Sequence, residues 1–195
     1  VLRVLPHSEA DIELRCLGWQ ARHRLGDASA LDEVAAAWRE LVSNPAACDP
    51  VLEAAATTAH VALDEVWWRF HRQIDSRDPA AAHDTLEWLG VGHARALRAL
   101  ITDPAGYLDR LPDDFAESRA ARELALAAIV RLARRDPPLA HVRLLRRTDR
   151  FTDEEQRRAY AALGYHGALS RLPLTTEWYR AAGDADLTAG QREWR

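Results

Sequence analysis

Signals that start and stop helices recur at short intervals along this chain, and they constrain its fold more than any other feature. Asp-Pro pairs occur at Asp49-Pro50, Asp78-Pro79, Asp103-Pro104 and Asp136-Pro137. In most of these pairs we expect the Asp to accept hydrogen bonds from the first free helix amides, with Pro at the first helical position. Thr152 with Glu155 and Thr188 with Gln191 have the spacing of capping boxes. The sequence therefore predicts many short helices.

Between these signals, apolar residues repeat at the three- and four-residue spacing of an amphipathic helix. The first predicted helix starts at Ser8, ends at Gly26 and buries the stripe Leu14, Leu17, Ala21 and Leu25. The second carries the stripe Leu31, Val34, Ala35, Trp38, Leu41 and Val42, and ends at Asn44 and Pro45. A third stripe consists of Leu63, Val66, Trp67, Phe70 and Ile74, and a longer helix is expected from about Phe115. Helices joined by such short turns should lie antiparallel.

No segment shows the apolar and polar alternation of a β-strand, so we predict an all-α fold. About ten or eleven helices could form a compact bundle or an α-solenoid. The short, similar helices favour the solenoid, a superhelix of short antiparallel helix pairs. We expect residues 1–195 to be a single superhelical segment and a fragment of a larger chain, because the sequence stops as a new helix begins.

Composition excludes several classes of function. A formal net charge of -4 gives no basic field for phosphates, so we expect no nucleic-acid partner. Charged residues interrupt every apolar run, so no transmembrane segment is expected. His83 with Glu87 and His60 with Asp64 are predicted to share helix faces, but zinc sites usually need three or four convergent ligands. Catalytic and phosphate-binding motifs are missing, so we expect neither a metal nor a cofactor.

Tryptophan and cysteine leave two questions open. Trp38 and Trp67 fall on apolar stripes and are predicted to be core residues. The remaining candidates for stacking on the apolar face of a sugar ring are Trp68, Trp178 and Trp194. Cys16 and Cys48 lie at the same end of the first helix pair, so either a disulfide or two buried thiols fits the predicted geometry.

Several segments, in order along nearly the whole chain, resemble the superhelical domain of the soluble lytic murein transglycosylases. They are Glu13-Leu-Arg-Cys16 with Gln20-Ala-Arg22, Ala46-Ala-Cys-Asp-Pro50, Arg122-Glu-Leu-Ala-Leu126 running on to Arg131-Leu-Ala-Arg-Arg-Asp-Pro137, Asp153-Glu-Glu-Gln-Arg157, Trp178-Tyr-Arg-Ala-Ala-Gly-Asp184 and Leu187-Thr-Ala-Gly-Gln191. In this family a ring of short helices supports a separate lysozyme-like domain. That domain cleaves peptidoglycan between N-acetylmuramic acid and N-acetylglucosamine and leaves a 1,6-anhydro sugar.

The resemblance implies a periplasmic scaffold segment that positions its own catalytic domain and peptidoglycan glycan strands through the full-length protein. It also implies a disulfide between Cys16 and Cys48. The family's catalytic Glu is followed by Ser and later by Gly-Leu-Met-Gln, which a chain without Met cannot contain. Glu117-Ser118 falls in a predicted scaffold helix, so we assign no catalytic residue to this segment. The alternatives are a free-standing α-solenoid that binds a peptide or protein, and a helical metal enzyme.

Overall fold

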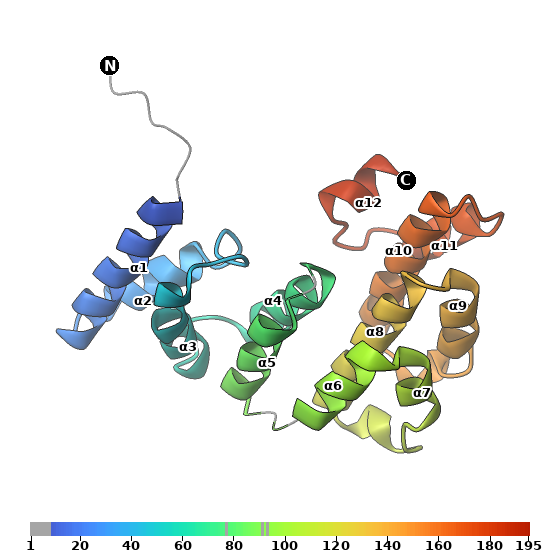
Figure 1. The fold of residues 1–195 in the computed structure, drawn as a ribbon, viewed down its shortest axis with the longest axis horizontal. Coiled ribbons are helices and arrows are strands. Elements are labelled where there is room, and N and C mark those ends of the chain that lie inside the picture. Colours follow the sequence, from blue (N-terminus) through green and yellow to red (C-terminus); the bar gives the residue numbers. More distant parts are fainter. Residues whose placement is uncertain (1–8, 77, 91, 93) are drawn as a thin grey trace. The chain divides into compact units, whose positions relative to one another are not determined.

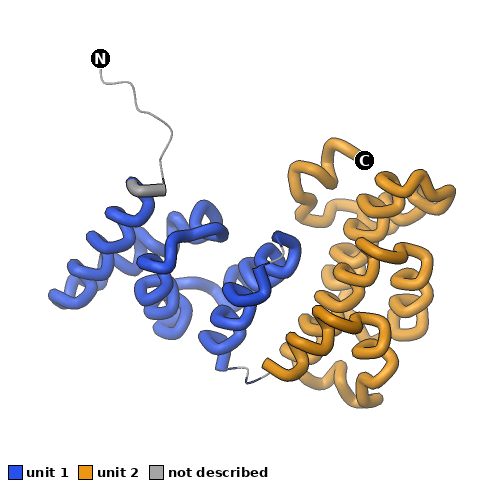
Figure 2. Tube along the Cα trace, viewed as in Figure 1, with its two compact units in different colours: residues 1–92 blue, residues 93–195 orange. Residues whose placement is uncertain are grey.

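The computed structural model describes residues 9–76, 78–90, 92 and 94–195. This part of the chain forms twelve α-helices and three short 3-10 helices, and it contains no β-strand (Figure 1). The predicted all-α class is confirmed. The chain divides into two compact units, residues 1–92 and 93–195 (Figure 2). That both belong to a single superhelical segment stays a prediction.

The described residues of unit 1 form five α-helices and one 3-10 helix. They are α1 (Glu9–Arg24), α2 (Ser29–Ala36), η1 (Ala46–Cys48), α3 (Asp49–Thr57), α4 (Leu63–Ser76) and α5 (Pro79–Trp88). Helices α1, α2 and α3 pack on one another, α4 packs on α5, and α5 also contacts α3. The consecutive helices α1 and α2, α2 and α3, and α4 and α5 therefore pack on each other, as neighbouring helices of an α-solenoid do.

Helix α1 buries a different face from the predicted one. The predicted stripe consists of exposed residues, Leu14, Leu17, Ala21 and Leu25. Cys16 and Trp19 are buried instead, and the Trp19 Nε1 donates a hydrogen bond of 2.8 Å to Glu33 of α2. Both faces have helical spacing, so only the position of α2 and α3 decides which one is covered. The predicted start at Ser8 lies outside the described residues.

The second helix is shorter than predicted. Regular α-helix ends at Ala36, although Trp38 and Leu41 of the predicted stripe are buried. Residues 37–41 continue as tight turns with bonds such as Leu41 N to Trp38 O, at 3.3 Å. This change of path turns the Leu41 carbonyl toward α4, where the Arg69 guanidinium donates to it at 2.7 Å. A contact with a distant helix therefore replaces the last helical turns.

Between positions 94 and 195, the described part of unit 2, there are seven α-helices and two 3-10 helices. They are α6 (Ala94–Thr102), α7 (Pro104–Asp109), η2 (Phe115–Glu117), α8 (Arg119–Ala133), α9 (Pro137–Leu145), η3 (Thr148–Arg150), α10 (Asp153–Leu169), α11 (Thr175–Ala182) and α12 (Ala189–Glu193). Helix α8 is central, since it contacts α6, α7, α9 and α10. The longer helix expected from Phe115 is thus divided into η2 and α8.

The predicted helix starts are mostly confirmed. Asp78, Asp103 and Asp136 each accept a backbone N–H three residues later and cap α5, α7 and α9. The capping boxes beginning at Thr152 and Thr188 are both present. Asp49 is the exception, because it is already the first residue of α3. None of the helices in the described ranges is long and apolar enough to cross a membrane.

Candidate functional site

A pocket of about 580 Å³ opens within unit 1. Its walls come from α1, the segment 42–46, the start of α3, and helices α4 and α5. This volume is in the range of small-molecule sites. Because the walls come from five parts of the chain, the pocket exists only when the whole unit is folded.

A buried arginine from α4 lines this pocket. Arg69 is 1% exposed. Its Nη1 donates to the Leu41 carbonyl at 2.7 Å, and its Nη2 donates to Asn44 Oδ1. No carboxylate of the described residues lies within ion-pair distance of it. Burial lowers the pKa of Arg69 to about 10, and the charge of nearby Asp49 opposes this shift. The guanidinium therefore remains charged at neutral pH in a poorly hydrated place.

Two indole rings surround this guanidinium. Its carbon lies 5.1 Å from the ring centroid of Trp38 and 5.8 Å from that of Trp88. The two rings are tilted against each other with centroids 6.5 Å apart. Cation–π contacts of this kind compensate part of the lost hydration of Arg69. Trp38 is buried, whereas Trp88 is half-buried and lines the pocket.

The buried amide of Gln73 also lines the pocket, where it forms hydrogen bonds with Arg69 and with α5. With its oxygen facing Arg69, Gln73 accepts from Nε of that residue at 3.2 Å. Its nitrogen then donates to the Ala81 carbonyl at 3.2 Å and to the Thr85 hydroxyl at 2.8 Å. This orientation gives the oxygen and the nitrogen of the Gln73 amide suitable partners and links α4 to α5. Buried polar groups need such partners, because an unpaired one is costly.

Three carboxylates lie at the pocket walls. Asp49 accepts from the side-chain amide of Asn44 at 2.9 Å. Asp78 caps α5 by accepting from the Ala81 amide at 3.1 Å. Asp84 is exposed and lies 3.5 Å from the His83 ring. In each case the contact uses one oxygen of the carboxylate, so acceptor capacity remains.

The predicted disulfide between Cys16 and Cys48 is present beside this pocket. The two Cα atoms are 4.9 Å apart, across 32 positions of sequence, and both residues are fully buried. The bond ties α1 to η1, and Gln20 of α1 donates to the Ala47 carbonyl of the same 3-10 helix. Both links hold η1, whose first residue, Ala46, lines the pocket.

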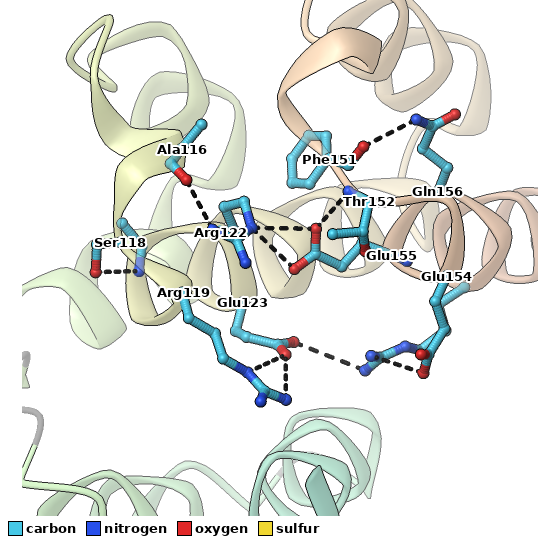
Figure 3. A network of polar contacts seen from close by, with 12 residues as sticks. Ala116, Ser118, Arg119, Arg122, Glu123, Phe151, Thr152, Glu154, Glu155 and Gln156 are labelled. Carbon is cyan, nitrogen blue, oxygen red and sulfur yellow. Dashed lines mark hydrogen bonds and ion pairs between the residues drawn. The ribbon is translucent and has the colours of Figure 1, made fainter. Parts of the chain in front are cut away.

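A second polar cluster lies in unit 2, between the starts of α8 and α10 (Figure 3). Glu155 of α10 accepts from Arg122 Nε at 3.1 Å and from its own cap amide, Thr152 N, at 2.8 Å. Arg122 also donates to the Ala116 carbonyl at 2.7 Å. The buried carboxylate of Glu155 thereby completes the cap at the start of α10 and joins α10 to α8.

The neighbouring Glu123 is 1% exposed and is held by two arginines. Arg119, one turn earlier on α8, lies 3.4 Å from its carboxylate, and Arg158 of α10 lies 3.7 Å away. Both acids of this cluster are thus charge-paired with cations from the helices they connect. The arrangement stabilises the contact between α8 and α10, and we assign it a structural role.

The remaining sequence-predicted residues do not line the pocket of unit 1. His83 and Glu87 share a face of α5, with their side chains 3.8 Å apart. His60 and Asp64 do not share a helix face, because α4 begins only at Leu63. In the described residues, no three side chains of the metal-ligating types come together. Glu117 is exposed and lies at the end of the 3-10 helix η2, ahead of the longer α-helix α8.

The tryptophan predictions are partly confirmed. Trp38 and Trp67 are both 2% exposed and belong to the core. Among the candidates for sugar stacking, Trp178 is buried, Trp68 is half-buried, and Trp194 is 51% exposed.

The indole that lines the pocket, Trp88, was not singled out by the sequence, and neither were Arg69 and Gln73. A signal for the latter two exists, because they occupy the apolar face of α4 beside Phe70 and Ile74. A polar residue in such a stripe must find buried partners.

Comparison with known proteins gives one informative result. No family model and no curated protein sequence matches the chain. The fold is similar to that of a solved structure, an inactive mutant of the lytic transglycosylase Slt from Pseudomonas aeruginosa. The similarity covers 94% of this chain with a TM-score of 0.67 and 22% sequence identity. The chain spans 30% of the length of that protein.

Proposed function

We propose that this chain is a scaffold segment of a periplasmic peptidoglycan lytic transglycosylase. The observation that carries this proposal is the fold similarity to Slt over 94% of the chain. It agrees with the ordered sequence segments that resemble the same family. A stack of helix pairs suits a scaffold, because small rotations between neighbours accumulate into an extended curved surface.

The disulfide supports the proposed location. Cross-links of this kind persist in oxidising compartments such as the periplasm and are rare in reducing ones. Cys16 and Cys48 are both fully buried, so the bond is also protected from exchange with external thiols. A scaffold that works outside the cytoplasm gains stability from such a link without needing a larger core.

In this proposal bond cleavage belongs to another domain of the full-length protein. The chain would position that domain and the glycan strands, while the lysozyme-like domain converts them to 1,6-anhydro products. Glu117 takes no part, since it is an exposed residue at the end of a 3-10 helix. The buried acids Glu123 and Glu155 are engaged by arginines and hold helices together.

The test compares the full-length product of the gene with residues 1–195 alone on purified murein sacculi. Mass spectrometry of the soluble products should detect 1,6-anhydro muropeptides from the full-length protein and none from the isolated chain. An open reading frame without a lysozyme-like domain would contradict the proposal. Digestion of murein by residues 1–195 alone would contradict it as well, because the scaffold would then be the enzyme.

A further inference from the structure

Helix α1 has apolar side chains on two opposite sides. One side, with Cys16 and Trp19, is buried where α1 contacts α2, η1 and α3. The other side, the exposed stripe of α1, consists of Leu14, Leu17, Ala21 and Leu25. An exposed apolar stripe predicts a partner, because surface helices normally keep that side polar. We infer that this stripe docks against the same stripe in a second copy of the chain, with the two helices antiparallel. The inference goes beyond the scaffold role and does not rest on it.

The exposed stripe of α1 is continuous and has the shape of a helix-packing surface. Leu14, Leu17 and Leu25 are 67%, 47% and 88% exposed, so covering them removes a large apolar area from water. Leu25 follows the last residue of α1, but its amide donates to the Ala21 carbonyl at 3.1 Å and keeps it in the helical path. Gly18 lies beside the stripe, where a Cβ would meet no atom within 4 Å. In an antiparallel pair, each Leu14 lies between Ala21 and Leu25 of the other copy, while the small residues let the helices approach.

The charges beside the stripe select the antiparallel direction. Glu13 and Arg24 are exposed and lie 11 positions apart, so both follow the same edge of the stripe, about three helical turns from each other. Neither forms an ion pair within the part of the chain that the structure describes. A two-fold axis between residues 18 and 19 places Glu13 of each copy opposite Arg24 of the other, so the contact is complementary to itself. A parallel pair would leave these two side chains on opposite edges of the interface.

A single helix from each copy gives a small interface, so the association should be weak. Specific interfaces of this size are transient, and we expect a dissociation constant on the order of 0.1 mM. Sedimentation velocity of residues 1–195 between about 10 µM and 1 mM brackets this constant. The chain should change from monomer to dimer over this range. It should form no larger species, because an isologous contact closes at two copies.

Two sets of variants test the apolar and the charged parts of the contact. Leu14→Asp should weaken dimerisation at least roughly tenfold, because it places a charge in the interface. Leu145→Asp, at a leucine of α9 that is 54% exposed, is its control and should leave dimerisation unchanged.

The charged edge is tested by reversal. Glu13→Arg alone and Arg24→Glu alone should each weaken dimerisation, because each brings like charges together at both ends of the interface. The double variant Glu13→Arg with Arg24→Glu should restore it, since the opposite charges face each other again. Glu53→Arg, at an exposed position of α3, is the control. Circular dichroism confirms that each variant is folded.

Cysteine cross-linking tests the position of the two-fold axis. With the axis between residues 18 and 19, Gly18→Cys brings the two introduced thiols together. Leu25→Cys leaves them about 20 Å apart along the helices, well beyond the roughly 7 Å limit on the Cα separation of a disulfide. Oxidation followed by non-reducing electrophoresis should therefore show a covalent dimer for Gly18→Cys and a monomer for Leu25→Cys. Cys16 and Cys48 are buried and paired with each other, so they do not compete.

Four outcomes with residues 1–195 overturn the inference. They are a monomer up to 1 mM, dimerisation that survives Leu14→Asp, a double charge reversal that does not restore dimerisation, and cross-linking through position 25 as efficient as through position 18. The full-length gene product is tested in the same way, and a covalent dimer of its Gly18→Cys variant supports the inference. A monomeric full-length protein in which α1 exchanges its amide hydrogens more slowly than in residues 1–195 overturns it, because another segment then covers the stripe. None of these results depends on murein cleavage, so failure here leaves the proposed scaffold role standing.

Discussion

The two units build similar helix stacks by different physical means. Unit 1 relies on a disulfide, a buried arginine and large aromatic rings, with Trp38, Trp67 and Phe70 in its interior. Unit 2 relies on small residues that bring helices close together. The Cβ of a residue at position 164 would lie 2.9 Å from the Tyr179 ring, so glycine is required at this contact between α10 and α11. The covalent link belongs to unit 1, whereas unit 2 combines the close packing of α10 and α11 with the ion pairs between α8 and α10.

The difference predicts how substitutions and changes of pH alter the stability of each unit. The polar network of unit 2 joins α8 to α10 directly, whereas the disulfide of unit 1 acts on the closure of a long loop. Hydrogen exchange followed by mass spectrometry reports on peptides from both units in one sample, so each change below can be assigned to the unit in which it acts.

The largest effect is expected from Glu155→Ala. The change removes a cap and leaves Arg122 without its carboxylate, so we expect unit 2 to lose roughly 3 to 5 kcal/mol of stability. Glu154→Ala is the matched control, because Glu154 is 71% exposed and its ion pair is with Arg158, one turn away on the same helix. We expect at most about 0.5 kcal/mol from the control. Equal hydrogen-exchange rates in the Glu155→Ala and Glu154→Ala variants would show that the contact of Glu155 with Arg122 does not stabilise the packing of α10 on α8.

Removal of the disulfide should have the next largest effect, this time in unit 1. The double substitution Cys16→Ala and Cys48→Ala opens a cross-link between positions 32 residues apart. On the chain-entropy model this costs roughly 3 to 4 kcal/mol. Chemical denaturation should show the lower free energy of unfolding. Hydrogen exchange of the folded protein should be faster in α1, η1 and α3. If exchange accelerates equally in unit 2, the two units are not stabilised separately.

Acid should weaken unit 2 before unit 1. Burial, aided by the charge of Arg134, lowers the pKa of His166 from 6.5 to about 4. Between these values the unfolded chain binds the proton and the folded chain does not, so stability falls as pH drops from 6.5 toward 4. The loss should be on the order of 2 kcal/mol, with little further change from this group below pH 4. In a pH series, His166→Gln should remove most of this dependence; an unchanged profile would assign it elsewhere.

The smallest effects should differ in sign between the units. Gly164→Ala places a methyl group against Tyr179 and should destabilise unit 2 by about 1 to 2 kcal/mol. Gly18→Ala, in the middle of α1, meets no atom within 4 Å. It should stabilise unit 1 by about 0.5 to 1 kcal/mol, because alanine loses less backbone freedom in a helix. Thermal melts of both variants would reveal whether this contrast between the units is real.

The sequence by itself determined the helix class and most helix starts. Asp78, Asp103, Asp136 and Thr152 could be assigned because a cap and its partner amide are three residues apart. The pairing of Cys16 with Cys48 followed from the family resemblance, and spacing alone left it open.

Only the tertiary structure decided which side of a helix is buried and where its polar groups find partners. Helix α1 had two possible stripes, and Cys16 with Trp19 is buried because α2 and α3 cover that side. Arg69 and Trp88 became parts of a pocket through contacts with Leu41 and Trp38, which lie far away in sequence. Local hydrogen bonds can be read from neighbouring residues, whereas burial depends on surfaces that meet only after the chain has folded.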